Sequence, residues 1–290
     1  MRRIITISLF LFLSVGVGRS QDNGFRYLGQ AEPTETPKVF QLPVMDGVAG
    51  ERIAVSTDYK ELYFTEIHPT NNTRHIVKQY RFNGRNWNGP YVLFDGYNEY
   101  GPSLSPDNSK LFINCDICDR TAAGWSQPTR FLKSKSIHYL QMTDNGNFYF
   151  LSFVNDSTTD IFKMVVKDKD KDKDTTFQAL GLNMKSTVQN DYYISSDESY
   201  MLVSLNKSEI QCFGGKDIFI RFKTKSGWSK PINLGNEINT NNAFTRFGMS
   251  LSPDKKIMFY TQVDPNGVFV YWVKIDGLFK RLKDREISNN

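Results

Sequence analysis

The sequence is poor in the residue types that most often perform catalysis, bind metals or cross-link a chain. Only three of its 290 residues are cysteine, and only three are histidine. It contains no Gly-x-Ser-x-Gly motif that would present a hydrolase serine, and no glycine-rich loop that would surround a phosphate. Its acidic residues form no recognisable catalytic pair. The common local motifs of enzymes are therefore excluded, whereas an active site assembled from distant segments is not.

The cysteines are too few for a structural zinc site of the usual kind. Cys115 and Cys118 form a Cys-x-x-Cys motif, and Cys212 is the third thiol. A structural zinc ion takes four ligands, commonly from two such motifs, and a thioredoxin-type motif opens a helix, whereas this one follows a segment with strand periodicity. A disulfide is the usual state of such a pair in an exported protein. The sequence thus predicts either a disulfide or inert thiols, with no metal and no cofactor.

The sequence also lacks an apolar run long enough to span a membrane. Its N-terminal run, Ile4 to Val17, has about 14 residues, against the roughly 20 that a membrane helix needs. Arg2 and Arg3 precede this run and small residues follow it up to Ser20, which is the order of a secretory signal. We therefore expect residues 1–20 to be a signal peptide and the mature chain to be periplasmic or secreted, without a membrane span. An uncleaved N-terminal anchor is the alternative.

A large excess of one charge is missing as well. The formal net charge is +5, and removal of the signal peptide with Arg2, Arg3 and Arg19 lowers it to +2. A chain of this size with so little net charge has no electrostatic surface for nucleic acid. An envelope or secreted protein, or a glycan, is therefore the predicted partner, and the protein is expected to be a monomer.

What the sequence has in abundance is a repeated β pattern, which is clearest from Gly214 to Tyr260. Ile218, Ile220 and Phe222 recur with the period of two that is typical of a strand. Ser252-Pro253-Asp254 is predicted to be a tight turn, because proline presets φ and the aspartate side chain can accept hydrogen bonds from nearby backbone N–H groups. The whole segment indicates four strands joined by turns and loops.

Three markers of this segment recur in the same order along the chain. The first is a Ser/Thr-x-Asp turn followed by an apolar strand, the second is Trp-x-x-Pro, and the third is Asp-Ile-Phe. The aspartates of the first marker are 49, 37, 53 and 57 residues apart, about the size of a four-stranded propeller blade. The turns end at Asp58, Asp107, Asp197 and Asp254, with a weaker copy, Met142-Thr143-Asp144, in the third repeat. The tryptophans are Trp87, Trp125 and Trp228, and the Asp-Ile-Phe sequences begin at Asp160 and Asp217.

The sequence therefore predicts an all-β fold, a β-propeller of four-stranded antiparallel blades over residues 37–283. Five turn markers indicate five blades, and six would follow if residues 20–48 or 276–290 contained a degenerate unit. The segment Lys38 to Leu42 resembles an outer strand that precedes any inner turn, so we expect it to complete the last blade and close the ring. Residues 21–36 are predicted to be a linker and residues 284–290 a C-terminal tail.

Two segments, SLSPDNSKLFI and SLSPDKKIMFY, resemble the WD40-like propeller repeats with a Ser-Pro-Asp signature that occur in TolB-type proteins. The stretch GGKDIFIRFKTKSGWSKPINLGNEIN is similar to exported members of Bacteroidetes type, and the ending VFVYWVKIDGLFKRLK fits their C-terminal strand and short helix. The resemblance covers roughly residues 37–283, although the third repeat has lost its proline. It implies a propeller but little about activity, because propellers serve as enzymes, binding modules and scaffolds.

Antiparallel blades place their loops on two faces. The Ser-x-Asp and Trp-x-x-Pro turns share one face, and the loops between second and third strands share the other with the connections between blades. Ligands tend to bind where loops converge on the channel mouth, so we expect the second face to hold the site. Five residues that enter the inner strands from that face are predicted to bind ligand: Arg52, Glu99, His138, Asp191 and Arg246.

Two functions are consistent with these residues, and ordinary solvated loop positions are the simpler alternative for all five. The first function is that of a non-catalytic exported propeller that binds a protein or glycan in the cell envelope. The second is that of a carbohydrate-active hydrolase or lyase, for which His138, Glu99, Asp191 and an arginine would have to converge on one pocket.

Three further features are predicted to be structural. Asp160 and Asp217 occupy the same step of their repeats. The three tryptophans precede outer strands, where a ring can cover its own blade and the neighbouring one; stacking on sugars is the alternative. Residues 167–174 alternate lysine and aspartate and indicate a solvated hairpin extension, since a calcium loop would need a glycine at its turn.

Overall fold

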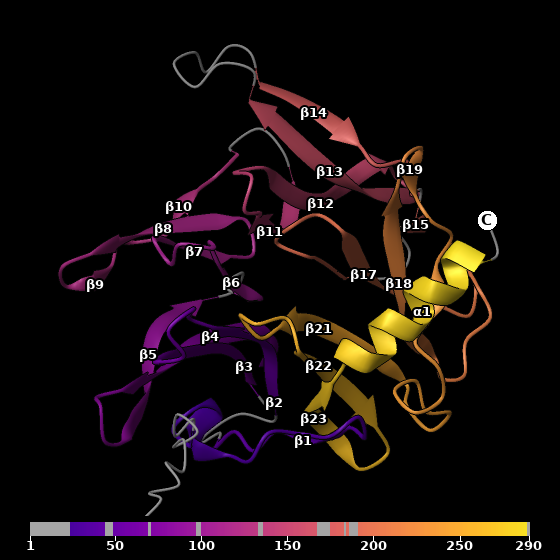
Figure 1. Ribbon diagram of the computed structural model, residues 1–290. Helices are drawn as coiled ribbons and strands as arrows, with labels where there is room; N and C mark the ends of the chain where they lie inside the picture. Colours follow the sequence, from indigo (N-terminus) through magenta and orange to yellow (C-terminus); the bar gives the residue numbers. More distant parts are fainter. Residues whose placement is uncertain are drawn as a thin grey trace, which may run out of the picture.

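Five antiparallel sheets surround a central axis in the computed structural model of the protein (Figure 1). The structure describes residues 24–43, 49–68, 71–96, 100–132, 136–166, 175–182, 184–185 and 191–288. The predicted all-β propeller and the choice of five blades are confirmed. The first blade contains β2 (Ala49–Val55), β3 (Glu61–His68), β4 (Asn71–Phe82) and β5 (Trp87–Gly96), and the second contains β6 (Pro102–Leu104), β7 (Lys110–Ile113), β8 (Asp116–Thr121), β9 (Gly124–Trp125) and β10 (Thr129–Arg130).

The remaining three blades follow in chain order around the axis. The third contains β11 (Ile137–Met142), β12 (Phe148–Asn155), β13 (Thr158–Val166), β14 (Thr175–Ala179) and β15 (Met184–Lys185). The fourth contains β16 (Tyr192–Ile194), β17 (Tyr200–Asn206), β18 (Lys216–Thr224), β19 (Gly227–Trp228) and β20 (Ile232–Asn233). The fifth contains β21 (Thr245–Leu251), β22 (Ile257–Asp264), β23 (Gly267–Lys274) and the N-terminal β1 (Lys38–Val39).

The Ser-x-Asp turns join the innermost strand of a blade to its second strand. In the first turn the Ser56 hydroxyl donates to the Asp58 carboxylate at 2.6 Å and accepts the Glu61 N–H at 2.9 Å. The next residue, Tyr59, takes a left-handed φ of 60°, which tightens the turn. The same serine-to-aspartate bond recurs at Asp107, Asp197 and Asp254. We call the side of the molecule that carries these turns the Ser-x-Asp face.

The N-terminal segment closes the ring, as predicted. Lys38 of β1 stands opposite Trp272 of β23 in an antiparallel pair, which makes β1 the outermost strand of the fifth blade. Upstream, η1 (Tyr27–Gly29) brings the Tyr27 ring against Tyr59 and Trp272, and Tyr27 is only 1% exposed. Part of the segment predicted to be a linker thus packs between the first and last blades.

Apolar side chains fill the spaces between neighbouring blades. Trp125 of the second blade packs on the first, where its indole N–H donates to the Tyr63 hydroxyl at 3.2 Å. Trp228 of the fourth blade packs in the same way against residues of the third, and the Trp87 N–H donates to the Phe25 carbonyl at 2.5 Å. The tryptophans therefore occupy the packing positions that their spacing predicts.

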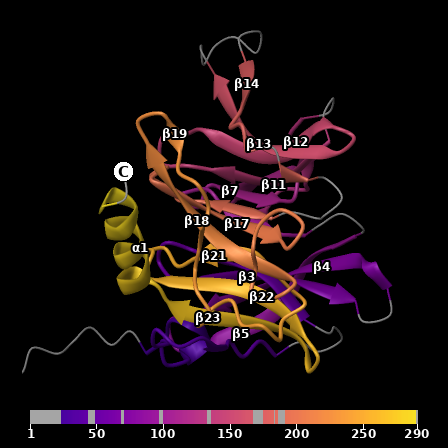
Figure 2. The ribbon, with the colours of Figure 1, turned by 90° about the vertical axis from the view of Figure 1, so that its right-hand side faces the viewer.

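A single α-helix among the described residues follows the last strand. This helix, α1 (Asp276–Ser288), packs Phe279 and Leu282 onto the apolar cluster between the fourth and fifth blades. It lies on the same side as the Trp228 hairpin, at the left of Figure 2, and so at the periphery of the Ser-x-Asp face. No helix among the described residues is long and apolar enough to cross a membrane.

Candidate functional site

Equivalent residues of the five inner strands meet on the axis of the propeller. Arg52 and Tyr139 adopt left-handed φ values of 46° and 57°, at bulges where the register of the inner strand shifts. The Arg52 guanidinium lies over the Tyr139 ring, 4.6 Å from its centroid. Glycine at position 101 makes room for this stack, because a Cβ there would lie 3.0 Å from the Tyr139 ring. We call the axial group the channel plug: Arg52, Gly101, Tyr139, Asp191 and Gly248.

The charges of the channel plug neutralise each other. Arg52 forms an ion pair with Asp191, and each side chain is 1% exposed. Arg52 also donates to the Tyr192 carbonyl at 2.7 Å, and Asp191 accepts the Gly248 N–H. Burial opposes the charge on Arg52, but Asp191 together with Tyr139, Glu51 and Tyr192 outweighs it and raises the pKa of the guanidinium. Two of the five residues predicted to bind ligand are thus paired with each other at the axis, and their role in binding stays a prediction.

Arg246, another predicted site residue, joins the fourth blade to the fifth. Its guanidinium lies 3.1 Å from the Asp217 carboxylate, and neither side chain is exposed. It also donates to Gln262 at 3.0 Å and to the Thr240 carbonyl at 2.8 Å. Burial lowers the pKa of Arg246. Asp217 in addition accepts the Phe213 N–H at 2.7 Å, in keeping with the structural role predicted for it.

Of the other two predicted site residues, His138 is connected to the channel plug through Tyr100, whose ring lies 5.5 Å from the Tyr139 ring. His138 Nδ1 lies 2.9 Å from the Tyr100 hydroxyl, and burial lowers the pKa of the imidazole. Glu99 lies outside the described residues. Arg52, Asp191 and His138 are thus joined through Tyr139 and Tyr100, whereas Arg246 pairs with Asp217.

Glu51 is a buried carboxyl that the sequence analysis missed. It precedes Arg52 in β2 and is 4% exposed. Burial, and then the nearby Asp191 carboxylate, raise its pKa to about 8. A charged residue next to Arg52 in an inner strand was the only local signal for it.

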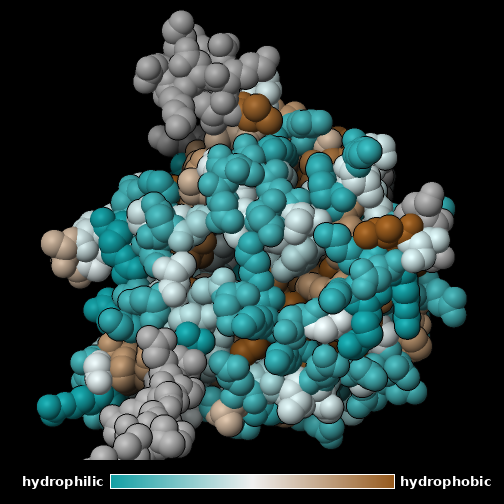
Figure 3. Space-filling view, in the orientation of Figure 1, coloured by the Kyte–Doolittle hydropathy of each residue, from teal (hydrophilic) through white to brown (hydrophobic). Residues whose placement is uncertain are grey.

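One pocket opens on the Ser-x-Asp face, whereas several loops of the opposite face, where we expected the site, lie outside the described residues. It has a volume of about 180 Å³ and lies between the inner strands, with Arg52 at its inner end and the Ser-x-Asp turns around its mouth. This face of the molecule is mostly hydrophilic (Figure 3). The lining comes from all five blades, and Asp144 is its only carboxylate among the described residues.

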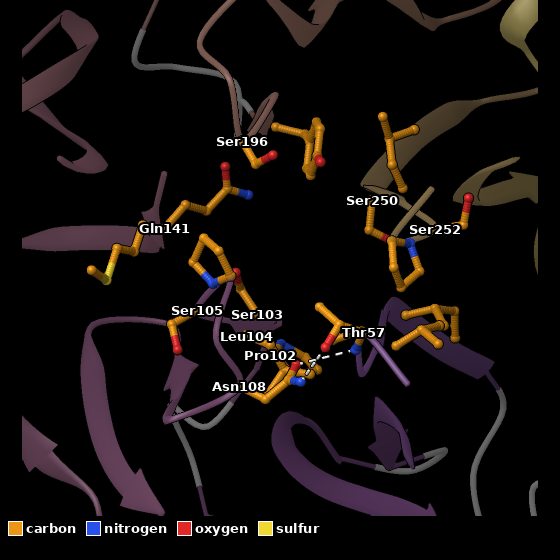
Figure 4. Close-up of a pocket in the computed structure, with 18 of the residues that line it drawn as sticks. Thr57, Pro102, Ser103, Leu104, Ser105, Asn108, Gln141, Ser196, Ser250 and Ser252 are labelled. Atoms are coloured by element: carbon orange, nitrogen blue, oxygen red, sulfur yellow. Dashed lines mark hydrogen bonds between the residues drawn. The ribbon is translucent and has the colours of Figure 1, made fainter. Parts of the chain in front are cut away.

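Several polar groups of this pocket have no partner among the described residues. Gln141 is 4% exposed and its Oε1 accepts the Ile194 N–H at 2.9 Å, but no described residue accepts from its Nε2. Its side chain extends toward the open centre in Figure 4. The Ser250 hydroxyl is buried without a hydrogen-bond partner, and the Ser103 hydroxyl has none among the described residues. An amide donor and two hydroxyls are thus available to a ligand.

The mouth of the pocket is held by hydrogen bonds between adjacent turns. Asn108 donates to Thr57 at 2.5 Å, and Ser196 donates to Asp144 at 2.8 Å. These contacts tie the second blade to the first and the fourth to the third. Since the groups at the mouth are already bonded to one another, the pocket is preformed rather than assembled around a ligand.

Sequence reasoning missed the pocket residues because serine and glutamine in a strand carry no catalytic or metal-binding signature. Their only signal is positional. Ser103, Gln141 and Ser250 each lie three or four residues before a turn aspartate, between the axial bulge and the turn.

The cysteines are thiols packed in two different cores. Cys115 lies in the cluster between the second and third blades, and Cys118 lies in the cluster between the first and second. No disulfide joins any of the three cysteines, all of which are described. The disulfide alternative is therefore wrong, because the two side chains of the motif face opposite sides of one blade. Burial raises the pKa of Cys115 to about 11, which keeps it protonated.

Two predicted features fall outside these observations. Residues 1–20, the predicted signal peptide, and residues 167–174, the alternating lysine and aspartate run, lie outside the described residues. Within the described part of the chain, no three histidine, cysteine or acidic side chains are grouped so as to hold a metal ion.

Comparison with known proteins shows the fold alone. No protein-family model and no curated protein matches the sequence. The catalytic domain of a GH62 α-L-arabinofuranosidase from Coprinopsis cinerea is 10% identical, with a TM-score of 0.50 over 83% of this chain and 94% of that chain. A candidate TolB from Agrobacterium tumefaciens is 17% identical, with a TM-score of 0.48 over 79% and 78%. An oligogalacturonate lyase from Vibrio parahaemolyticus is 11% identical, with a TM-score of 0.40 over 78% and 66%.

Proposed function

We propose that the protein is an exported, non-catalytic β-propeller that binds a protein or glycan of the cell envelope, and that the pocket on the Ser-x-Asp face is its binding site. Export rests on the charged, apolar and small-residue order of residues 1–20. The Ser-Pro-Asp repeats, which resemble those of exported TolB-type and Bacteroidetes-type propellers, are consistent with it. The periplasm or the cell exterior is the proposed location.

The observation that carries this proposal is the set of unpaired polar groups in a preformed pocket. Buried donors and acceptors nearly always have partners in folded proteins, because an unpaired one costs free energy. The Ser250 hydroxyl departs from this rule, and across the opening Gln141 Nε2 faces the pocket without an acceptor among the described residues. A ligand that bonded to both groups would remove this cost, which favours binding at this end of the channel.

Binding is better supported than catalysis because the pocket lacks a pair of acid–base groups. Glycosidases use two carboxylates on opposite sides of the scissile bond. Among the described lining residues only Asp144 is a carboxylate. The hydrolase or lyase alternative requires Asp191 and His138 at the other mouth, where Asp191 is bonded to Arg52 and to the Gly248 N–H.

The proposal is tested by capturing ligands with the mature protein from a cell-envelope extract and on a glycan array. Three forms are compared: wild type, Gln141→Glu and Gln178→Glu. The first substitution keeps the acceptor for Ile194 but removes the amide donor from the pocket, whereas Gln178 is exposed on β14, an outer strand. We expect a ligand that binds wild type and Gln178→Glu but not Gln141→Glu. Ligands that bind all three forms equally would place the site elsewhere.

A further inference from the structure

We propose that this pocket binds one uncharged sugar unit end-on, as the terminal residue of a glycan chain. This inference rests on the proposed function and narrows it to a ligand class. It is drawn from the size of the pocket, the charges beneath it and the direction of its unpaired groups.

The size of the pocket limits the ligand to one small unit. Its volume of about 180 Å³ is below the roughly 300–1,000 Å³ of pockets that enclose drug-sized molecules. The channel plug closes its inner end, since Arg52 and Asp191 are 1% exposed. A chain cannot pass through, so a polymer can enter only by its terminus.

The charges around the pocket favour an uncharged ligand. At the inner end the Arg52 charge is already compensated by Asp191. At the mouth Lys255 is paired with Asp197 at 3.1 Å, which leaves Asp144, itself bonded to Ser196, as the carboxylate of the lining. A ligand carboxylate would meet the Asp144 carboxylate at the mouth, and a ligand ammonium would find no uncompensated carboxylate beside Arg52 at the inner end. Arg52 Nε and Nη1 are buried without a hydrogen-bond partner, so the inner end still offers N–H donors to a ligand hydroxyl.

The unpaired groups point to a ligand with several hydroxyls. Ser103, Gln141 and Ser250 come from the second, third and fifth blades and surround the opening in Figure 4. Hydroxyls around a sugar ring point in several directions, and each can donate and accept, so one ring can meet all three groups. Leu104 and Ile194 in the lining offer apolar surface to the C–H groups of the ring.

A peptide fits these features less well. An extended peptide binds by adding a strand to an exposed sheet edge, and such a strand would need to continue along the channel that the plug closes. A single polar side chain has fewer hydrogen-bonding groups than a sugar ring. Binding of a peptide is therefore the alternative outcome that the experiment must distinguish.

The test is a titration of the mature protein with methyl glycosides of neutral hexoses and pentoses, in which binding is detected from the NMR signals of the protein. Glucuronic acid and glucosamine are the charged counterparts. Wild type is compared with Ser103→Ala and with Ser157→Ala, a matched change at an exposed serine on the β12–β13 hairpin of the opposite face. We expect at least one neutral glycoside to bind, Ser103→Ala to weaken it about fivefold to tenfold, and Ser157→Ala to leave it unchanged.

The outcomes separate this inference from the proposed function. Preferential binding of a charged counterpart, or absence of binding by every neutral glycoside, overturns the sugar inference. If an envelope protein is then captured by wild type but not by Gln141→Glu, the proposed function stands with a protein ligand. If a captured ligand binds Gln141→Glu as tightly as wild type, both the sugar inference and the proposed pocket are overturned.

Discussion

Titratable side chains are stabilised in their ionised form at one end of the channel and in their neutral form at the other. On the Ser-x-Asp face, a hydrogen bond from Ser105 lowers the pKa of Asp107 to about 2, so this carboxylate is ionised. On the other side of the channel plug, burial raises the pKa of Glu51 to about 8 and lowers the pKa of Lys216. One end therefore combines ionised, hydrogen-bonded turns with a neutral pocket, whereas burial at the other end disfavours charge.

This difference indicates that charged residues near the axis of a propeller are not necessarily the residues that bind its ligand. Arg52 and Asp191 are the most noticeable axial charges, yet they neutralise each other as an ion pair, although Arg52 Nε and Nη1 are buried without a hydrogen-bond partner. The groups left open to a ligand are an amide and hydroxyls, which are less costly to leave unpaired than a buried charge. The comparison can be tested at the plug, at the Glu51 side, at a blade interface and in the pocket.

The largest effect is expected from breaking the plug. Asp191→Ala removes the counter-charge of a buried arginine, and we expect the free energy of unfolding to fall by about 3–5 kcal/mol in urea denaturation. Arg281→Ala is the control, because its pair with Glu35 is about half exposed and is worth less than about 1 kcal/mol. Equal losses in the two variants would contradict the role of the plug.

The next effect is a pH dependence on the Glu51 side. The pKa of Glu51 is raised from 4.5 to about 8, so the folded state holds its proton more tightly than the unfolded state. Stability from this group is full below pH 4.5 and is lost as the pH rises to about 8, with a slope of at most about 1.4 kcal/mol per pH unit. Glu51→Gln should flatten this slope in urea titrations at several pH values. An unchanged slope in the variant would show that Glu51 ionises normally.

Glu198, on the Ser-x-Asp face, provides a control whose effect on stability appears at low pH. Burial opposes the ionisation of Glu198, but hydrogen bonds from Asn147, Tyr149 and Lys163 outweigh it and lower its pKa to about 2. Its stabilisation is present above pH 4.5 and is lost as the pH falls toward 2. Glu198→Gln should therefore lower the free energy of unfolding at neutral pH. It should not alter the decrease in stability between pH 4.5 and about 8 that Glu51 causes.

A smaller effect is expected at a blade interface that lies away from both ends of the channel axis. Trp228 is half-buried between the third and fourth blades, so Trp228→Ala should lower the free energy of unfolding by about 2 kcal/mol, less than for a fully buried ring. Ligand binding by the folded variant should be unchanged. Unaltered melting with abolished binding would instead support the alternative in which these rings stack on sugars.

The smallest effect is expected in the pocket and has the opposite sign. Ser250→Ala removes a buried hydroxyl that has no partner, so stability should rise by up to about 1 kcal/mol while ligand binding weakens. Ser204→Ala is the matched control, because that buried hydroxyl donates to the Arg246 carbonyl at 2.5 Å and its loss should destabilise. A loss of stability in Ser250→Ala would show that the hydroxyl is satisfied in solution.

The repeats could be predicted well because their signals are local. A serine and an aspartate two residues apart fold into the same turn in four blades, and these turns with the weaker copy at Asp144 indicated five blades. The unpaired strand from Lys38 indicated closure, and its pairing with Trp272 confirms it. The cysteine motif was less informative, because alternation along β8 and its preceding turn decides which core each thiol enters.

The candidate site depended on contacts that short segments do not encode. Short segments of the chain encode the blade pattern, the ring closure and the positions of the tryptophans, since hydrogen-bonded turns and a period of two act over a few residues. The contact of Arg52 with Asp191, 139 residues away, and the opening of a pocket on the Ser-x-Asp face arise from the folded ring. The physical reason is that axial bulges in separate blades aim side chains across the channel, and which of them meet depends on the angle between blades that only the closed ring sets.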